Sequence, residues 1–267
     1  GVRADRGGGG DGARGVGRDR GGGGDVTDSD AIVFDGVRKT YGRVVAVDRV
    51  SFRVAQGSFV GLIGHNGAGK STCLKMLMGL VHPTEGAVRI DGVDVHRDPI
   101  VARQRLGAVP EEPSLYEWLT AREFLEFVAA VRGQGDVGRA LGVADLGGDA
   151  ERPIREYSQG MRRRTALAAA MLGAPKVLVL DEALNGLDPP SAARIKGLLR
   201  DHVDQGGTVL LSTHVVETVE RAADRVVLLA HGTVIGDERT ADLGAGGLER
   251  LFVERLRGDP ARARPPG

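Results

Sequence analysis

The chain has 267 residues, of which 41% are hydrophobic and 27% are charged, so it is long enough for one sizeable core with or without a small appended subdomain. Lys plus Arg and Asp plus Glu both number 36, and a net charge of zero gives no indication of a nucleic-acid partner. The longest nearly apolar stretch, 166–172, is far too short for a membrane-spanning helix, which needs about 18 residues. The single cysteine, Cys73, excludes an internal disulfide and a cysteine-based zinc cluster.

The first thirty residues differ in composition from the rest of the chain. They contain twelve of the 42 glycines, and the unit D-R-G-G-G-G-D occurs twice in them, at 5–11 and 19–25. Flexible glycine with alternating Arg and Asp has little to bury, so we predict a disordered leader over 1–30. An RNA-binding tail is the alternative, although the Asp residues cancel the Arg charge and no aromatic side chain is available for stacking on bases.

After the leader, short β-rich runs bounded by Gly and Asp predict strands at 32–37, 50–54 and 58–63. A glycine-rich turn that begins at Gly64 and a helical run over 71–80 follow the third strand. This order of strand, loop and helix is typical of a nucleotide-binding α/β unit.

Later apolar runs predict a larger sheet. Strands are expected at 177–180, 209–211 and 226–229, and they alternate with helical patterns at 189–202 and 215–222. Such alternation predicts a mostly parallel sheet that helices cover on both faces.

Between about residues 111 and 157 the strand patterns disappear. Apolar residues recur there with helical spacing, at Phe124, Leu125, Val128 and Val131. The spacing predicts a helix over 120–131 and makes this part a helical insert. A further amphipathic helix is predicted at 248–256, before a Pro- and Arg-rich tail from Asp259 that we expect to fray.

Residues 64–72, G-H-N-G-A-G-K-S-T, fit the phosphate-loop pattern G-x-x-x-x-G-K-[ST] and lie between a predicted strand and a predicted helix. Gly64, Gly67 and Gly69 allow the backbone to curl so that successive N–H groups point at phosphate oxygens. The positive end of the following helix attracts the same oxygens. Lys70 is expected to bridge the β- and γ-phosphates.

The other loop residues complete a predicted nucleotide site. The Ser71 hydroxyl is expected to ligate Mg²⁺, and Thr72 to contact the α-phosphate. Asn66 and Ala68 are included because they lie in the loop that curls around the phosphates. We interpret Cys73, the next residue, as a small buried residue of the first helix; a redox switch beside the nucleotide is the alternative.

An apolar strand ends in two carboxylates at 176–182, K-V-L-V-L-D-E. A buried parallel strand delivers such side chains at its carboxyl edge, where ligands bind. Asp181 is expected to hold Mg²⁺, and Glu182 is expected to polarise the water that attacks the γ-phosphate. A solvated turn is the structural alternative, which the preceding phosphate loop disfavours.

A phosphate loop and an acidic strand end occur in kinases, GTPases, helicases and transport ATPases alike. No N-K-x-D sequence follows the loop, which disfavours a GTPase. Further motifs follow in a specific order: K-T-Y-G with Tyr41, Y-S-Q-G-M at 157–161, N-G-L-D at 185–188, and S-T-H ending at His214. With these motifs, residues 31–256 resemble the ATP-binding cassette (ABC) family of transport ATPases.

The resemblance implies an α/β fold. It consists of a phosphate-loop ATPase core over 31–240 with a mostly parallel sheet, an antiparallel β part near the N-terminus, and a helical subdomain inserted at about 111–173. Residues 241–267 then form a C-terminal helix and a frayed tail.

The resemblance also implies roles for single residues. Tyr41 stacks on adenine, and His214, the switch histidine, contacts the γ-phosphate and the attacking water, so that the catalytic residues are Lys70, Glu182 and His214. Ser158 and Gly160 of the signature motif face the γ-phosphate of an ATP molecule that another subunit holds, and Asp188 lies along that subunit. Two ATP molecules with Mg²⁺ are thus enclosed between head-to-tail subunits, in a homodimer or with a paired ATPase subunit.

The implied partner is a separate transmembrane permease, which the ATPase drives as a peripheral protein on the cytoplasmic face of the cell membrane. The motif forms, with L-E-R-L-F-V-E-R at 248–255, look most like ATPases of drug or antibiotic exporters. One rival hypothesis is a soluble ABC ATPase, although the chain has no room for a long coiled coil or a second cassette. The other is a non-hydrolysing nucleotide-gated adaptor, which the predicted catalytic residues disfavour.

Departures from the family pattern concern the metal site and the signature. Glu111, in V-P-E-E-P, stands where the family usually has Gln, and we expect its carboxylate to ligate Mg²⁺ all the same. Gln159 and Met161 replace the Gly and Gln of the usual signature, which removes polar contacts but leaves Ser158 and Gly160.

Two further groups of residues have open interpretations. One group either receives a short cytoplasmic helix of the permease or belongs to the core of the insert; it consists of Leu115, Tyr116, Trp118 and Leu119. The other is the basic cluster at 162–164, three arginines, which we interpret as a solvated face with some interdomain pairing rather than as a nucleic-acid patch.

Overall fold

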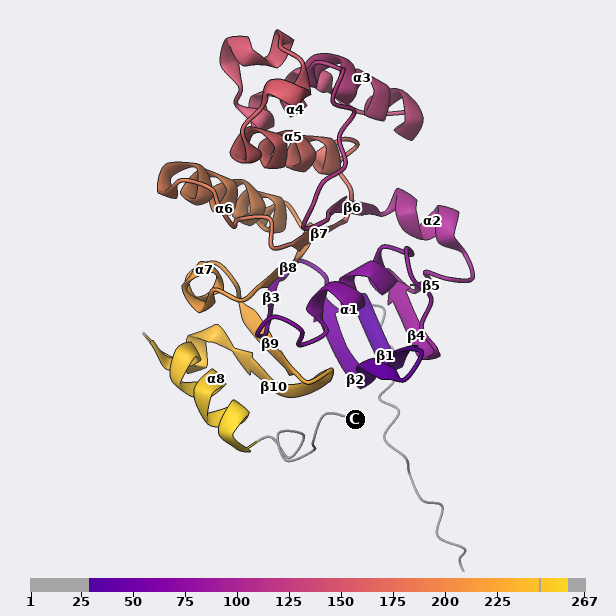
Figure 1. The fold of residues 1–267 in the computed structure, drawn as a ribbon, viewed down its shortest axis with the longest axis vertical. Coiled ribbons are helices and arrows are strands. Elements are labelled where there is room, and N and C mark those ends of the chain that lie inside the picture. The colour runs from indigo at the N-terminus through magenta and orange to yellow at the C-terminus, as the bar shows by residue number, and fades with distance from the viewer. Residues whose placement is uncertain (1–28, 245, 259–267) are drawn as a thin grey trace, which may run out of the picture.

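A computed structural model describes residues 29–244 and 246–258 (Figure 1). The predicted leader therefore lies outside the described residues, except for Ser29 and Asp30, and the tail from Asp259 lies outside them entirely. Asp30 is the first residue of strand β1, so β structure begins at the last residue of the predicted leader.

The N-terminal sheet is antiparallel, with its four strands in the order β2-β1-β4-β5. The strands are β1 (Asp30–Tyr41), β2 (Val44–Ala55), β4 (Glu85–Ile90) and β5 (Val93–Asp94). Phe34 of β1 lies opposite Phe52 of β2, and their rings stack with centroids 4.5 Å apart. This cross-strand pair stabilises the register. The predicted antiparallel part near the N-terminus is confirmed.

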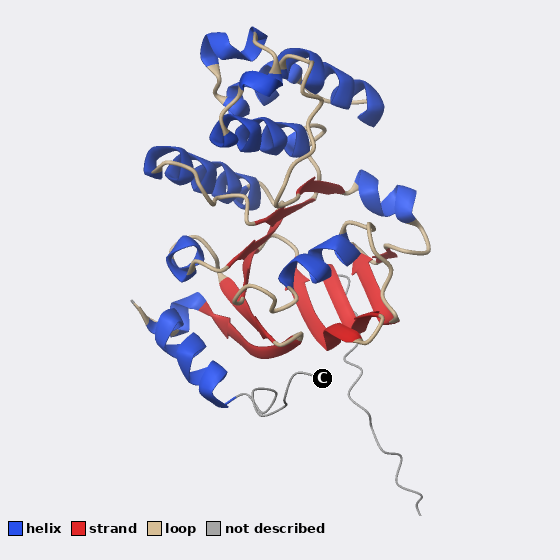
Figure 2. Ribbon diagram, in the orientation of Figure 1, coloured by secondary structure: helices blue, strands red, loops and turns tan. Residues whose placement is uncertain are grey.

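The larger sheet has six strands in the order β10-β9-β3-β8-β7-β6 (Figure 2). They are β3 (Phe59–Ile63), β6 (Leu106–Val109), β7 (Val177–Asp181), β8 (Thr208–Thr213), β9 (Arg225–Ala230) and β10 (Thr233–Arg239). Neighbouring strands are parallel except for β9 and β10. Every residue of β3, β7 and β8 is buried, as expected for parallel strands covered on both faces, and the predicted mostly parallel sheet is confirmed.

Helices connect and cover the strands. They are α1 (Lys70–Leu77), α2 (Pro99–Gln104), α3 (Ala121–Arg132), α4 (Val137–Ala144), α5 (Gln159–Met171), α6 (Pro189–Asp204), α7 (Val216–Glu220) and α8 (Gly247–Gly258), with 3-10 turns at Gly147–Glu151, Ile154–Glu156 and Thr240–Asp242. α1 and α7 are shorter than the helices predicted at 71–80 and 215–222. None of the helices in 29–244 and 246–258 combines the length and the apolar character that crossing a membrane requires.

Alternating side chains of the large sheet divide the core into two clusters. On one face, Leu62 of β3 and Val179 of β7 share a cluster with Leu74 of α1, and α1 lies between the two sheets (Figure 1). On the other face, Leu180 of β7 shares a cluster with Leu199 of α6 and with residues of α5. In the described residues both faces of β3, β7 and β8 are therefore covered, and polar groups become accessible where these strands end.

Between β6 and β7 the chain forms α3, α4 and α5, which lie together at one end of the long axis (Figure 1); we call these three helices the helical lobe. α3 begins with a capping box, in which Thr120 Oγ1 accepts from Glu123 N at 3.1 Å and Glu123 Oε2 accepts from Thr120 N at 2.8 Å. Phe124 and Leu125 are buried, as their spacing predicts, whereas Val131 is 71% exposed. The last turn of α3 therefore adds little to the core.

Candidate functional site

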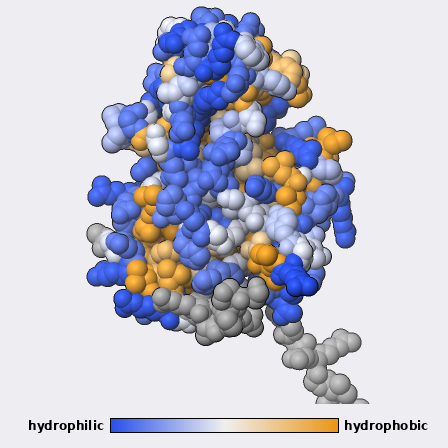
Figure 3. Space-filling view, in the orientation of Figure 1, coloured by the Kyte–Doolittle hydropathy of each residue, from blue (hydrophilic) through white to orange (hydrophobic). Residues whose placement is uncertain are grey.

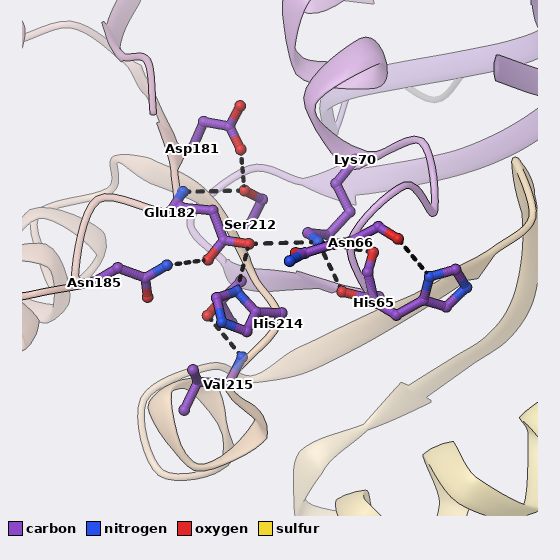
Figure 4. Close-up of polar contacts among 11 residues, drawn as sticks. His65, Asn66, Lys70, Asp181, Glu182, Asn185, Ser212, His214 and Val215 are labelled. Carbon is purple, nitrogen blue, oxygen red and sulfur yellow. Dashed lines mark hydrogen bonds and ion pairs between the residues drawn. The ribbon is translucent and has the colours of Figure 1, made fainter. Parts of the chain in front are cut away.

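The carboxyl ends of three neighbouring strands bring the polar residues together. In the parallel register, Ile63 at the end of β3 lies opposite Thr213 of β8, and Asp181 at the end of β7 lies opposite Ser212 of β8. The phosphate loop, the acidic pair and His214 therefore leave the sheet at one edge, which Figure 4 shows in close-up. Ligand sites of open α/β sheets lie at such edges.

Glycine is required in the phosphate loop on steric grounds. Gly69, the N-cap of α1, has φ 104°, which L side chains rarely adopt. At Gly64, a Cβ would lie only 2.4 Å from the carbonyl oxygen of Leu229. The loop is also anchored from outside, because Gly232 N donates to Ala68 O at 3.0 Å. The phosphate loop therefore has a curved backbone conformation that is fixed without a bound ligand.

Lys70 reaches from the first turn of α1 back into the loop and is 5% exposed. Its Nζ donates to Gly64 O at 2.7 Å and to His65 O at 3.3 Å. The same Nζ lies 3.4 Å from Glu182 Oε1. The ammonium group therefore stands between the loop and the acidic strand end, where a β- or γ-phosphate oxygen can compete for its hydrogens.

Glu182 is a buried carboxylate with a partner on each oxygen. Besides Lys70, its Oε1 lies 3.0 Å from His214 Nδ1, and its Oε2 accepts from Asn185 Nδ2 at 2.8 Å. Because a carboxylate only accepts, the His214 proton must sit on Nδ1. Burial alone would raise the pKa of Glu182, but the His214 hydrogen bond, the Lys70 charge and the Asn185 hydrogen bond outweigh it, and the pKa lies below its ordinary value.

The backbone at Glu182 is strained. Its φ is 50°, in the left-handed region that side chains with a Cβ avoid. The conformation is stabilised by Ser212, because Glu182 N donates both to Ser212 O and to Ser212 Oγ, each at 3.2 Å. Strain of this kind persists only where the surroundings enforce it, and it is concentrated at functional sites.

Asp181 is fixed by the same serine. Ser212 Oγ donates to Asp181 Oδ1 at 2.5 Å, and the aspartate is 3% exposed. This hydrogen bond occupies Oδ1 and leaves Oδ2 available as a metal ligand at the sheet edge. Ser212 and Asn185 begin the motifs S-T-H and N-G-L-D, but the sequence analysis assigned neither residue a role of its own. The available signal for Ser212 was a hydroxyl at the end of the apolar run of β8, since a buried polar group needs partners.

Other predicted site residues lie around this edge. Ser71 and Thr72 are half-buried in the first turn of α1, whereas Asn66 and Gly67 are exposed in the loop. Tyr41, at the end of β1, is 47% exposed, and Lys39 Nζ lies 5.0 Å from the centroid of its ring.

Glu111 follows β6, the strand beside β7, and is exposed. Among the residues that the structure describes, its carboxylate has neither a hydrogen bond nor an ion pair. The structure thus places Glu111 beyond the same edge of the sheet without joining it to Asp181 or Ser71.

The signature residues and Asp188 are not brought to the phosphate loop. Ser158 is the N-cap of α5, and its Oγ accepts from Met161 N at 3.3 Å. Asp188 is the N-cap of α6, where its Oδ1 accepts from Ser191 N at 2.9 Å. Within 29–244 and 246–258, no hydrogen bond joins Ser158, Gly160 or Asp188 to the phosphate loop.

The residues with open interpretations divide. Tyr116 and Trp118 are 58% and 77% exposed, whereas Leu115 and Leu119 are half-buried and pack against the core. The core interpretation is therefore confirmed for Leu115 and Leu119, and contact of Tyr116 and Trp118 with a permease helix stays a prediction. Figure 3 shows further hydrophobic side chains at the surface over α2 and over the end of α3; the most exposed of them are Ile100 and Val131.

The basic cluster after the signature is mostly paired. Arg162 contacts Glu117 at 2.5 Å, and Arg164 lies 3.7 Å from Asp145. Cys73 is fully buried, and burial raises the pKa of its thiol to about 12. The core interpretation of Cys73 is thereby confirmed, and the redox switch is excluded by lack of access.

Comparison with known proteins agrees with this geometry. A family model described as "ABC transporter" matches residues 47–185. The Nod factor export ATP-binding protein I of Paraburkholderia xenovorans is 38% identical over 240 residues, covering 88% of this chain and 79% of the relative. The daunorubicin resistance ATP-binding protein DrrA3 of Streptomyces coeruleorubidus is 38% identical, covering 84% and 74%. The bacitracin transport ATP-binding protein BcrA of Enterococcus faecalis is 33% identical, covering 78% and 69%.

Solved structures share the fold. One, described as the ATP-binding subunit of an ABC transporter, has a TM-score of 0.79 and 30% identity, and the match covers 85% of this chain and 99% of that chain. Another is the ATP-binding cassette MJ0796 as a dimer in a post-hydrolysis state with ADP and Pi; its TM-score is 0.73 at 27% identity, and the match covers 78% and 98%.

Proposed function

The chain belongs to the ABC transporter family, and we propose that it is the ATP-hydrolysing subunit of an exporter of drug-like or antibiotic compounds. The observation that carries this proposal is the convergence of Lys70, Glu182 and His214 at one edge of the sheet (Figure 4). The names of the relatives, which include a daunorubicin resistance protein and a bacitracin transport protein, support the exporter assignment.

The residues present fit Mg²⁺ as well as ATP. A serine hydroxyl and a carboxylate oxygen are hard donors of the kind that Mg²⁺ prefers, and Ser71 and Asp181 supply them, with Glu111 as a third proposed ligand. No group of three or more His, Cys, Asp or Glu side chains in the described residues forms a metal site by itself, so nucleotide oxygens and water must complete the shell. The bound ion supplies positive charge that offsets charge developing on the phosphates.

Hydrolysis needs a base that is ionised and correctly aimed. Glu182 is ionised because its pKa is lowered. The contacts with His214 and Asn185 fix the orientation of its carboxylate. As the water oxygen attacks the γ-phosphorus, Glu182 accepts the water proton and ADP leaves. Lys70 must turn from Glu182 to the phosphates when ATP binds, which frees Oε1 for that proton.

A second copy of the ATPase completes each pocket. Ser158 and Gly160 begin a helix with no hydrogen bond to the phosphate loop of its own chain among the described residues, so they serve an ATP molecule held by another subunit, along which Asp188 lies. Tyr41 stacks on the adenine of the ATP bound by its own chain. The dimeric state of a solved relative supports this arrangement. Closed and open dimers then bind ATP with different affinity, which lets the nucleotide drive the motion.

The transported compound crosses the membrane in a separate permease, and the chain works at its cytoplasmic face as a peripheral protein. The exposed Tyr116 and Trp118 are the proposed contact for a short helix of the permease. No nucleic-acid partner is proposed, because the net charge is zero.

Phosphate release from Mg²⁺-ATP tests hydrolysis directly. Purified wild-type protein should release phosphate, and Lys70→Ala should not. An adaptor that only binds nucleotide would show saturable ATP binding without phosphate release, which would overturn the catalytic part of the proposal.

Purification from native membranes tests the interaction with a permease. An integral membrane protein should be recovered with the wild-type protein and not with Trp118→Glu. A wild type that carries no membrane protein would favour the soluble alternative.

A further inference from the structure

Two histidines from distant parts of the chain lie together beside the phosphate loop. His65 is the second residue of the loop, and His231 lies in the turn between β9 and β10. Their ring centroids are 5.3 Å apart, and the ring planes are inclined at 59°. Figure 4 shows the His65 ring pointing away from Glu182 and His214. The pair therefore lies outside the site proposed for hydrolysis.

The backbone that carries the two histidines is fixed. His231 has φ 47°, in the left-handed region that few side chains occupy. Its neighbour Gly232 donates through N to Ala68 O at 3.0 Å and accepts at O from Asp48 N at 2.8 Å. These hydrogen bonds attach the β9–β10 turn to the phosphate loop on one side and to β2 on the other. The two histidine backbones are thus held in place relative to each other.

One nitrogen of His65 is prepared to bind a metal ion. Its Nδ1 lies 2.7 Å from the backbone oxygen of Asn66. Because a carbonyl oxygen only accepts, Nδ1 carries the proton, and Nε2 of the neutral imidazole has a free lone pair. Metal-binding histidines generally donate their other ring N–H to a carbonyl or a carboxylate in this way, which fixes the tautomer and the orientation of the ring.

The distance between the rings fits a tetrahedral ion. Two imidazoles whose nitrogens lie about 2.0–2.1 Å from one tetrahedral Zn²⁺ ion have ring centroids roughly 5 Å apart, and the observed separation is 5.3 Å. Imidazole is a common ligand of Zn²⁺, whereas Mg²⁺ prefers oxygen ligands. The pair is therefore suited to zinc and not to the magnesium that accompanies ATP.

The two rings line a hollow with room for the rest of a coordination shell. Its volume is about 350 Å³, and its other lining residues, Val253, Leu256 and Arg257, belong to α8. The described residues place no third His, Cys, Asp or Glu ligand beside the pair. Water or a small anion must therefore fill the remaining positions, and the Arg257 guanidinium is placed to balance the charge of such an anion.

We propose that His65 and His231 bind Zn²⁺ through their imidazole nitrogens, so that the ion joins the phosphate loop to the β9–β10 turn beside α8. An ion that binds the folded chain and not the unfolded one stabilises the fold by mass action. The inference does not depend on ATP hydrolysis, because the proposed ligands are present without nucleotide.

Calorimetric titration with Zn²⁺ tests the site in protein without nucleotide, since phosphates would compete for the ion. We expect saturable binding to the wild type. His231→Asn should weaken it by at least about tenfold, the scale on which a damaged metal site loses affinity. Asparagine tolerates the left-handed conformation but lacks the imidazole. His65→Ala should cause a loss of similar size.

A second histidine pair supplies the matched control. The rings of His82 and His96 have centroids 4.7 Å apart, but Nε2 of His96 is buried, which closes that nitrogen to an ion from solution. His82→Asn should therefore bind Zn²⁺ as the wild type does. Equal zinc affinity in His231→Asn and the wild type, or an equal loss in His82→Asn, would overturn the proposal.

Thermal unfolding and diffraction locate the ion without any turnover. With Zn²⁺ at 100 times its Kd, the Tm of the wild type should rise by about 5–10 °C, and EDTA should reverse the rise. An equal rise in both His231→Asn and His65→Ala would contradict the site. Anomalous scattering at the zinc absorption edge should place the ion between the two rings; an ion beside Glu182 and His214 instead would refute the assignment.

Discussion

The phosphate edge of the large sheet and the N-terminal end of α5 differ in how their polar groups are satisfied. At the edge, Lys70, Asp181 and Glu182 are buried and every one of them has partners from other segments. At α5, Ser158 is exposed, and among the described residues its hydroxyl has a hydrogen bond only within its own helix. The first region is preorganised for phosphates within one chain, whereas the second is an exposed surface, which the proposed function assigns to the nucleotide of another subunit.

The largest effect should come from breaking the first region. Glu182→Gln keeps the shape of the side chain but cannot take up a proton, so turnover should fall by about 10² to 10⁴. Binding of labelled ATP should persist, because the phosphate loop is untouched. Glu112→Gln, at an exposed neighbouring acid of Glu111, is the control; equal turnover in both variants would contradict the role of Glu182.

Mixing two inactive variants tests the second region. Lys70→Ala damages the pocket of its own chain, and Ser158→Ala damages the pocket of its partner. A mixed dimer therefore has one intact pocket, and an equimolar mixture should regain up to about a quarter of wild-type phosphate release. No recovery on mixing would mean that both residues serve the same pocket, and the contrast between the regions would fail.

Both regions were predictable as motifs, but their contacts were not. Residues 64–72 and the apolar run before Asp181 are contiguous, so local pattern and burial place them at strand ends. The hydrogen bond from Ser212 to Asp181 depends on the register in which β7 and β8 pair. The sequence of either strand alone does not determine that register. Glycine and alanine weaken the patterns of β4 and β6, which explains why the sequence predicted neither strand.

The segment 115–119, for which the sequence left two interpretations, shows a second limit of prediction from sequence. Leu115 and Leu119 face the core while Tyr116 and Trp118 face solvent, although all four are apolar or aromatic. The segment follows neither a strand nor a helix period, and without a period the sequence does not tell the inward side from the outward one. The helical spacing of α3 similarly predicted a buried Val131, which its position in the last turn leaves exposed.

A smaller effect is expected from Ser212→Ala. The variant removes the hydrogen bond to Asp181 Oδ1 and the second acceptor of Glu182 N, and it leaves buried polar groups unpaired at a cost of about 1–3 kcal/mol. Urea unfolding should show this loss, together with reduced turnover. Ser114→Ala, at an exposed position, should show neither; a fully stable Ser212 variant would mean that the serine does not organise the edge.

Tyr41→Ala should weaken nucleotide binding moderately. Stacking of a base on an aromatic ring is worth about 1–3 kcal/mol, so the Kd for ATP should rise by about 5- to 150-fold while the Kd for inorganic triphosphate stays the same. Tyr41→Phe keeps the ring and should bind ATP nearly as wild type does. If the Kd for inorganic triphosphate also rose, Tyr41 would be stabilising the phosphate loop rather than stacking on the adenine base.

Cys73 should give the smallest effect. Burial raises the pKa of the thiol to about 12, so little reactive thiolate forms at pH 8, and burial blocks access as well. Iodoacetamide should leave the native protein unlabelled and its turnover unchanged, while protein unfolded in urea should be labelled fully. Rapid labelling of native protein would show that α1 opens readily.

The central claim is that ATP holds two copies of this chain together, each completing the pocket of the other. Light scattering of Glu182→Gln protein, with and without saturating Mg²⁺-ATP, tests it most directly because the variant traps the bound state. The account predicts a monomer without nucleotide and a dimer with it, and a further Ser158→Ala substitution should weaken that dimer. A mass that stays monomeric at saturating ATP would contradict it.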